Sequence, residues 1–400
     1  MIRATDVDAG EIRTDNLLRV DPAELPMDRN PYLEVGEIIV VRSGAYTGDS
    51  AIIPQELARA VVGYDMVATV TRALPQFVAY ALLSKYVLDD QILLLTLRAA
   101  QPHLNVEELG SVVLAVPSNN QEQQRIAAYL DASCAAIDAA VAAKRRQIET
   151  LDGVRKDVIQ QAVTRGLKRN QSLRQTGNVW MPQVPANWEL VGLKRISEIQ
   201  TGLTLGKVYE CLLIERPYLR VANVQDGHLN LAEVTMIEVP EEVAHRVTLR
   251  VGDVLMTEGG DLDKLGRGTI WNGEIADCLH QNHIFAVRCC QHKLLPSFLA
   301  YLTASQYGRD YFEATGKRTT NLASTSSRKV GMFPIPCPPL DEQEKICTFL
   351  DGKLANIGHI QAGIETQITT LTAYRKSLIH ECVTGQRRVP EHNTSNLVLP

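Results

Sequence analysis

Residues 121–126 read Gln-Glu-Gln-Gln-Arg-Ile, and residues 341–346, which lie 220 positions later, read Asp-Glu-Gln-Glu-Lys-Ile. The correspondence continues without a gap until residue 164 on the first copy and residue 384 on the second. Gapless self-similarity over such a length indicates that one structural unit is used twice in the chain.

Weaker matches lie upstream at nearly the same separation. Residues 33–38 correspond to residues 249–254, and residues 77–82 correspond to residues 298–302. The repeated unit is therefore a variable globular segment followed by a better-matched one. The first copy has nothing that corresponds to residues 185–218, so we expect its globular segment to be incomplete at the N-terminal side.

Both well-matched segments have the pattern of a long helix. Apolar residues recur at alternating steps of four and three, which keeps one seam facing a partner helix as in a coiled coil. Each helix could span ~65 Å at ~1.5 Å per residue. Because both copies belong to one chain, effective concentration favours their pairing with each other, and we expect them to run antiparallel. The predicted seam residues are Leu130, Cys134, Ile137, Val141, Ile148, Leu151 and Val158 in the first helix and Leu350, Leu354, Ile357, Ile364, Ile368, Leu371 and Leu378 in the second.

Four polar residues interrupt this seam. Their long side chains either extend past the seam to solvent or pair with the opposite helix and fix its register, and the sequence leaves both interpretations open. At the start of the first helix, Ser118 and Gln121 have the spacing of a capping box. The four interrupting residues are Lys144, Arg155, Gln361 and Arg375.

The globular segments have the pattern of a mixed α/β fold. Runs at residues 37–41, 253–256 and 283–287 are typical of strands, and residues 76–95 and 296–314 are typical of helices. The fold class is therefore two α/β copies joined by two long antiparallel coiled-coil helices. The expected boundaries are a first domain at 1–120, a first helix at 121–167, a linker at 168–185, a second domain at 186–340, a second helix at 341–386 and a tail at 387–400.

Composition limits the possible partners. The chain of 400 residues is 45% hydrophobic and 22% charged, with a net charge of −5 and a pI near 6.0. Such a protein does not bind polyanions through its overall field, so any nucleic-acid contact depends on local basic patches. Its eight cysteines have no disulfide-framework spacing, which favours a reducing cytoplasm. The apolar stretch at residues 78–97 contains charges and is expected to be a buried helix, so no membrane association is expected.

No catalytic motif is evident. Gly202 to Lys207 has the wrong spacing for a phosphate-binding loop, and Cys337 to Leu340 lacks the amide and the ring of an amino-methyltransferase motif. The acidic run at residues 341–345 fits a helix N-terminus better than a nuclease centre. We therefore expect no catalytic residue and no cofactor. A weaker alternative is zinc bound by some of Cys278, His280, His283, Cys289, Cys290 and His292, although their spacing favours ordinary core and surface roles.

Basic and amide side chains gather in glycine- and serine-rich loops. Such side chains bond phosphate, and arginine or asparagine can also read base edges in the major groove. We expect DNA contact from at least one of these loops. The candidate DNA-binding residues are Lys264, Arg267, Lys317, Arg318, Asn321, Ser324, Arg328 and Lys329 in the second copy, with Arg98, Gln101, His103 and Asn105 in the first.

Three motifs carry a resemblance to a known family. Residues 188–202 resemble the opening of a target-recognition domain, and residues 333–346 resemble its exit into a spacer helix. Residues 116–126 are similar to that exit in the first copy. Together they resemble the specificity subunits of type I restriction-modification systems over nearly the whole chain, with a first target-recognition domain that is truncated at its N-terminal side.

The resemblance implies a non-catalytic subunit. Such subunits hold two target-recognition domains, each of which reads one half of a split double-stranded DNA target, while the helices act as a ruler. It also implies two kinds of partner, namely methyltransferase (modification) subunits that use S-adenosylmethionine and translocating restriction nuclease subunits. The alternatives are a stand-alone enzyme and a coiled-coil adaptor protein without a DNA-reading role, which salt-insensitive partner binding without duplex affinity would favour.

Overall fold

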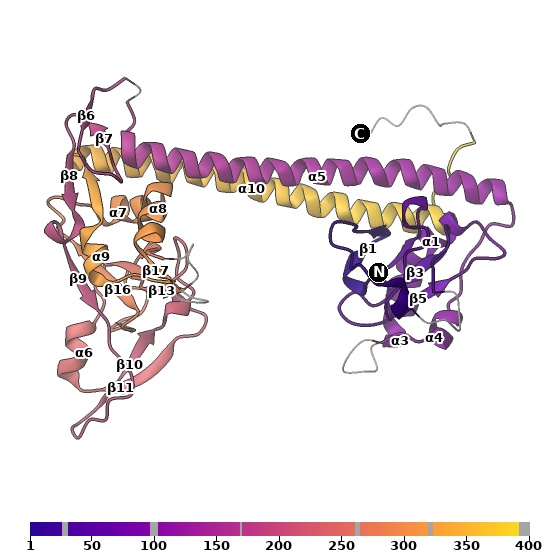
Figure 1. Cartoon of the computed structure of the whole chain (residues 1–400), viewed down its shortest axis with the longest axis horizontal. Helices are drawn as coiled ribbons and strands as arrows, with labels where there is room; N and C mark the ends of the chain where they lie inside the picture. The colour runs from indigo at the N-terminus through magenta and orange to yellow at the C-terminus, as the bar shows by residue number, and fades with distance from the viewer. Residues whose placement is uncertain (26–30, 97–102, 169, 261–264, 319–322, 392–400) are drawn as a thin grey trace. The chain divides into compact units, whose positions relative to one another are not determined.

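The computed structural model describes residues 1–25, 31–96, 103–168, 170–260, 265–318 and 323–391 (Figure 1). The chain divides into two compact units. Unit 1 comprises residues 1–147 and 362–400, and unit 2 comprises residues 148–361. Both long helices, α5 (Asn120–Arg165) and α10 (Leu340–Val383), contribute to each unit.

Unit 2 is a mixed α/β domain around a four-stranded sheet with the order β14–β12–β16–β9. Every pair in this sheet is antiparallel. Three further strand groups surround it, with the orders β11–β10–β15, β13–β18–β17 and β19–β8, and β6 pairs with β7. The strands are β6 (Leu173–Gln175), β7 (Gln183–Pro185), β8 (Glu189–Gly192), β9 (Ser197–Thr201), β10 (Ile214–Leu219), β11 (Thr235–Val239), β12 (Val254–Thr257), β13 (Gly259–Gly260), β14 (Gly268–Ile270), β15 (Leu279–His280), β16 (Ile284–Cys289), β17 (Lys317–Arg318), β18 (Ala323–Ser324) and β19 (Pro334–Cys337); the helices are α6 (Glu241–Val247), α7 (Pro296–Ala304), α8 (Gln306–Thr315) and α9 (Ser327–Met332).

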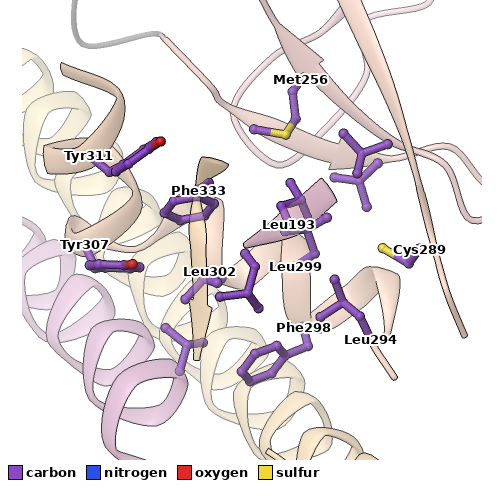
Figure 2. Packing of buried hydrophobic residues seen from close by; sticks show 14 of the residues in the cluster. Leu193, Met256, Cys289, Leu294, Phe298, Leu299, Leu302, Tyr307, Tyr311 and Phe333 are labelled. Atoms are coloured by element: carbon purple, nitrogen blue, oxygen red, sulfur yellow. The ribbon is translucent and has the colours of Figure 1, made fainter. Parts of the chain in front are cut away.

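The core of unit 2 is aromatic where the sheet meets the helices. The rings of Tyr307 and Phe333 stack with centroids 5.3 Å apart, and Phe312 contacts Phe333 at 5.0 Å. Figure 2 shows this cluster beside the two long helices, whose Val163 and Leu350 are fully buried in it. Fully burying one such side chain contributes about 1.5–3 kcal/mol, so the helices are part of the domain core.

Unit 1 is a smaller version of the same domain. Its sheet has three antiparallel strands with the order β4–β3–β5. The helical segment that follows contains a short π-helical stretch, Leu88–Leu93. The strands are β1 (Val7–Asp8), β2 (Glu11–Ile12), β3 (Ile38–Val40), β4 (Ser50–Ile52) and β5 (Met66–Ala68); the helices are α1 (Pro75–Leu83), α2 (Lys85–Val87), α3 (Leu94–Thr96) and α4 (Val106–Gly110).

The two sheets are equivalent strand for strand, because β4–β3–β5 has the order and direction of β14–β12–β16. Unit 2 then adds β9 beside β16 and β8 beside β19. Within the described residues, unit 1 has no strand in either position. Its edge side chains are accordingly exposed, with Val67 of β5 at 37% and Val113, which corresponds to Pro334 of β19, at 71%. The expected gap in the first copy therefore lies along these two edges.

In each unit the long helices run antiparallel, which confirms the predicted pairing. In unit 1 the Arg375 Nε atom donates to Asp138 Oδ2 at 3.1 Å. In unit 2 the Gln361 Nε2 atom donates to Asp152 Oδ1 at 2.8 Å. In unit 1 the contact on α10 moves back from Arg375 to Gln367 as α5 advances from Asp138 to Lys144. In unit 2 it moves back from Gln361 to Glu342 between Asp152 and the end of α5 near Gly166. Three of the four polar seam residues thus pair across the helices, since Lys144 also donates to Gln367, whereas Arg155 is exposed.

A buried glutamine joins each long helix to its own domain. The Gln343 side chain, fully buried, accepts from Leu295 N at 2.9 Å and donates to the carbonyl oxygens of Lys293 at 2.8 Å and Pro338 at 2.9 Å. Gln123 makes two of these three contacts in unit 1, accepting from the N–H of residue 74 and donating to the carbonyl of residue 117, both at 2.7 Å. Each amide satisfies backbone groups that helix termini would otherwise leave unpaired.

Two predicted helices are broken at equivalent serines. The helix expected at residues 76–95 stops at Ser84, and that expected at 296–314 stops at Ser305. Both serines adopt extended backbone conformations, and both hydroxyls donate to the carbonyl three residues earlier, at 2.6 Å. Local hydrogen bonding of this kind competes with helix continuation.

Two further expectations were wrong in detail. The segment at 168–185, expected to be a linker, contains the β6–β7 hairpin, in which Val184 is fully buried. The cap of α5 is Asn119 rather than Ser118, since its side chain accepts from Gln121 N at 2.9 Å. By length and composition alone, α5 is the one described helix that is long and apolar enough to cross a membrane. In both units, α10 packs against the apolar seam of α5.

Candidate nucleic-acid interface

In unit 2 the structure brings the two predicted basic loops together. Strand β18 pairs with β13 on one side and with β17 on the other, so Ser324 faces both Gly259 and Lys317. The backbone N–H of Thr325 also donates to Glu258 O at 2.7 Å. The loop after the central strand β12 and the loop before α9 therefore form one surface. We call the place where these two loops pair the junction.

Unit 1 repeats this junction. Ser43, just after β3, forms a bridge with His103, and the backbone N–H of Leu104 donates to Arg42 O at 2.8 Å. The next residue, Asn105, caps α4 by accepting from Glu108 N at 2.8 Å. Ser326 has the same capping position ahead of α9. Among the predicted residues, Asn105 therefore has a structural task at the edge of the junction.

The other predicted residues divide into those that can reach a ligand and those held by the fold. Lys317 and Arg328 are exposed, whereas Lys329 is half-buried and its ammonium donates to the Thr315 carbonyl. Arg267 is half-buried beside β12. Arg318 lies in β17, and Ser324 is half-buried in β18. Arg98, Gln101, Lys264 and Asn321 lie outside the described residues.

Four side chains at the junctions were not predicted to contact DNA, although one of them, His283, was considered as a zinc ligand. The guanidinium carbon of Arg42 lies 4.6 Å from the centroid of the Tyr64 ring. At the equivalent place in unit 2, the Glu258 carboxylate lies 2.5 Å from His283 Nδ1. None belongs to a basic run, and only a gapped comparison of the two copies places them at the same point of the fold.

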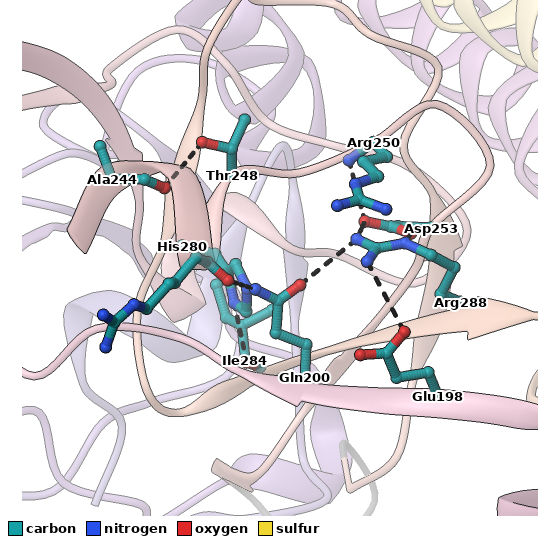
Figure 3. A network of polar contacts seen from close by, with 10 residues as sticks. Glu198, Gln200, Ala244, Thr248, Arg250, Asp253, His280, Ile284 and Arg288 are labelled. Atoms are coloured by element: carbon teal, nitrogen blue, oxygen red, sulfur yellow. Dashed lines mark hydrogen bonds and ion pairs between the residues drawn. The ribbon is translucent and has the colours of Figure 1, made fainter. Parts of the chain in front are cut away.

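At the end of β12 and β16 away from this junction, an ion pair to the buried Asp253 joins the two strands of unit 2 (Figure 3). Arg288 of β16 donates to both carboxylate oxygens of Asp253, at 2.9 and 2.8 Å, and Asp253 also accepts from Arg250 N at 2.9 Å. In unit 1, Glu37 has the position of Asp253 and accepts from Glu34 N at 2.8 Å. This two-pronged geometry holds β12 and β16 in register from the end of the strands opposite the junction.

His280, a candidate zinc ligand, is a core residue. It is fully buried in β15, and its Nδ1 lies 3.0 Å from the Ile284 carbonyl oxygen, so Nδ1 carries the proton. Burial lowers its pKa to about 4 from the usual 6.5. The histidine is therefore neutral at physiological pH, and its Nε2 has no hydrogen-bond partner.

The rest of the predicted zinc group is no closer to a metal site. Burial raises the pKa of the Cys278 and Cys289 thiols to about 12, so both are protonated rather than thiolate ligands. His283 bonds Glu258 instead. No group of three potential ligands exists in the part of the chain that the structure describes.

The state of His280 predicts a pH dependence of stability. The unfolded chain binds a proton below about pH 6.5, whereas the folded chain resists it until about pH 4. The free energy of unfolding should therefore fall as the pH drops from 6.5 to 4, by at most about 3 kcal/mol at ~1.4 kcal/mol per pKa unit. Urea unfolding between pH 7 and 4 should show a shallower slope for His280→Gln than for the wild type. The exposed His228→Gln variant serves as the control, and parallel profiles for wild type and His280→Gln would refute this assignment.

Each unit also has a cleft beside the long helices. In unit 2 it has a volume of about 660 Å³ and is lined by Tyr301, Asp351 and Arg155 among others. Its counterpart in unit 1 measures about 240 Å³ and contains Tyr80, which donates to Asp131 at 2.7 Å. The clefts recur because the same helix faces form them.

Comparison with known proteins agrees with this architecture. Residues 22–150 match the family described as type I restriction modification DNA specificity domain. The MjaX protein of Methanocaldococcus jannaschii, provisionally assigned as a type I restriction enzyme specificity subunit, is 26% identical over 214 residues, which cover 53% of this chain and 48% of that protein. The EcoKI specificity subunit of Escherichia coli K12 is 23% identical over 270 residues, 66% of this chain and 56% of that protein. The chain thus spans about half the length of these relatives.

Solved structures share the fold. A chain from a study of complex assembly and conformational transition in the type I restriction-modification system superposes with a TM-score of 0.74 at 16% identity, over 96% of this chain and 90% of that one. The HsdS subunit from Thermoanaerobacter tengcongensis gives a TM-score of 0.54 at 17% identity over the same shares. Both likenesses concern the fold. The matched domain and the named relatives make this chain similar to the specificity subunits of type I restriction-modification systems.

Proposed function

We propose that the chain is the DNA-reading, non-catalytic subunit of a type I restriction-modification complex, and that each unit reads one half of a bipartite target. The observation that carries the proposal is the duplicated junction. Both units join the loop after the central strand to the loop before a short helix, by the same backbone hydrogen bond to Arg42 O or Glu258 O. A duplicated surface with different side chains suits two different half-sites.

The helices suit a spacing role in this proposal. Each is a single helix, and each contributes core residues to both domains. Two readers that are held on one duplex gain affinity because binding by the first raises the effective concentration of the second. The half-sites must then follow the helical repeat of DNA, ~10.5 base pairs per turn.

We further propose that methyltransferase subunits and a translocating nuclease subunit assemble on this chain in the cytoplasm. The helices keep apolar side chains exposed, notably Phe349 at 38%, Val154 at 43% and Ile360 at 49%. Exposed apolar side chains on otherwise charged helices suit protein–protein contact. The relatives named above are subunits of restriction enzymes, which supports the same assignment.

The experiment is selection from a pool of randomised duplexes with the full chain, alone and with its methyltransferase subunits. Two short conserved half-sites at a fixed separation are expected, with affinity falling steeply as salt rises. Partner assembly without any duplex selection would instead identify a coiled-coil adaptor.

Replacing Lys317, Arg318, Arg328 and Lys329 with alanine should weaken binding to all duplexes alike. Each lost phosphate contact should lower the slope of log K against log salt by about 1. Fluorescence anisotropy at several salt concentrations measures both effects, while partner assembly is expected to persist. Alanine at Lys345 and Lys353, two exposed lysines of α10, is the control. Unchanged affinity in the fourfold variant would remove this loop from the interface.

A further inference from the structure

The two junctions carry opposite chemistry at the same point of the fold. We define the junction cluster as Arg42, Tyr64 and His103 in unit 1, and as Glu258, His283 and Ser324 in unit 2. Their equivalence rests on backbone contacts rather than on sequence similarity. His103 and Ser324 bridge the residues that follow Arg42 and Glu258, namely Ser43 and Gly259.

The third member of each cluster precedes an equivalent strand. Tyr64 lies two residues before Met66, which pairs with Val40 of the central strand. His283 lies two residues before Phe285, which pairs with Met256 at the same place in β12. The clusters therefore occupy one structural position in two copies, and differences between them are differences in side-chain chemistry.

In unit 1 the cluster is a donor. The Arg42 guanidinium lies over the Tyr64 ring at 4.6 Å, and its Nε donates to His103 Nε2 at 3.3 Å. The Arg42 backbone N–H is held by Asp65 Oδ1 at 3.0 Å. Tyr64 is 69% exposed, so the stacked guanidinium lies at the surface. An arginine oriented by an aromatic face keeps its terminal N–H groups in a fixed plane.

In unit 2 the cluster is an acceptor. The Glu258 carboxylate lies 2.5 Å from His283 Nδ1, and the Glu258 backbone N–H donates to His283 O at 2.8 Å. The two side chains are 27% and 53% exposed. A carboxylate close to DNA is repelled by the phosphates. A hydrogen bond from an amino group on a base would offset this repulsion.

Building on the proposed function, we propose that the junction clusters are the base-reading groups that make the two half-sites differ. Arg42 reads guanine, because a planar guanidinium donates to both O6 and N7 in the major groove. Glu258 reads cytosine, because a carboxylate accepts from the N4 amino group. His283 is a positioning residue that orients the carboxylate.

The test uses duplex selection with the full chain in three variants, Arg42→Ala, Arg42→Lys and Glu258→Gln. Arg42→Ala should reduce the preference for guanine at one position of one half-site about 10- to 100-fold and leave the other half-site unchanged. Arg42→Lys should retain most of the affinity but lose much of that preference, because a lysine ammonium makes no planar two-pronged contact. Glu258→Gln should relax one position of the opposite half-site.

Matched controls are available in each unit. Arg59 also lies over a tyrosine, with its guanidinium carbon 5.3 Å from the Tyr32 ring, but lies outside the cluster. Glu274 is an exposed glutamate of unit 2 that accepts from the Asn272 backbone. Arg59→Ala and Glu274→Gln should leave both half-sites intact. Thermal unfolding of each variant checks that it is folded.

The outcomes distinguish this inference from the proposed function. A wild-type chain that selects no sequence would sink the proposed function and this inference with it. A wild-type chain that selects a bipartite site, with variants that keep every base preference, would overturn the inference alone. Uniform weakening by Arg42→Ala across all sequences would also overturn it, since that is the behaviour of a phosphate contact.

Discussion

Replacing Gln343 with alanine is expected to lower the free energy of unfolding of unit 2 by about 3–5 kcal/mol. The side chain is fully buried and bonds three backbone groups, of Leu295, Lys293 and Pro338. Each buried group left without a partner costs about 1–3 kcal/mol, and the lost volume adds a cavity.

Tryptophan fluorescence during urea unfolding measures this change selectively. The chain has three tryptophans, Trp180, Trp188 and Trp271, and all lie in unit 2. Glu344→Ala, at the exposed neighbouring position of α10, should change the midpoint little. A Gln343→Ala midpoint equal to that of Glu344→Ala would show that the buried amide does not join the helix to the domain.

Replacing Gly202 with alanine should destabilise unit 2 by about 3–5 kcal/mol, because backbone and not side chain occupies the space beside it. A Cβ atom at Gly202 would overlap the carbonyl oxygen of His280 and would lie 2.5 Å from that of Gln281. Relief requires β9 and the segment after β15 to separate. The Leu203 N–H, which donates to His280 O at 2.8 Å, would lose its partner.

At a helical glycine with no neighbouring atoms, substitution with alanine is expected to raise the free energy of unfolding instead. A Cβ atom added at Gly358 of α10 would meet no other atom within 4 Å, so Gly358→Ala should stabilise the helix by about 0.5–1 kcal/mol. Urea midpoints of both variants, read by fluorescence and by circular dichroism, make the comparison. A Gly202→Ala protein as stable as the wild type would mean that the strand and the loop are not in contact.

The repeat predicted the architecture because helix periodicity and self-similarity are local properties of a sequence. Gln123 and Gln343 lie inside the most similar stretch, yet their role depends on carbonyl groups supplied from other segments, which periodicity does not encode. Gly202 illustrates the same limit. In the sequence it belongs to the motif at residues 188–202 and to a segment with the wrong spacing for a phosphate loop, but neither pattern shows that a carbonyl oxygen nearly 80 positions away requires a glycine here.

The candidate interface was predicted only in part, for a related reason. Lys317 and Arg328 were predicted because basic runs are visible in a sequence, and the structure shows only that both are exposed. Arg42 and Glu258 were missed because each is a single charge after an apolar strand. Their correspondence passes through strand pairing, and loops of different length in the two copies hide it from an ungapped comparison.

The uncovered strand edges of unit 1 affect how the protein can associate with other polypeptides. Val67 and Val113 lie at edges of unit 1 that are exposed, whereas β9 and β8 cover the equivalent edges within unit 2. The Val113 and Ala115 N–H groups donate to the Gln91 and Tyr86 side chains, whereas the equivalent residues of β19, Pro334 and Pro336, have no N–H to donate. An open edge is a template onto which any extended polypeptide can add a strand. Contact with foreign chains should therefore begin at the β5 edge of unit 1 and spare unit 2, where β9 covers the equivalent edge.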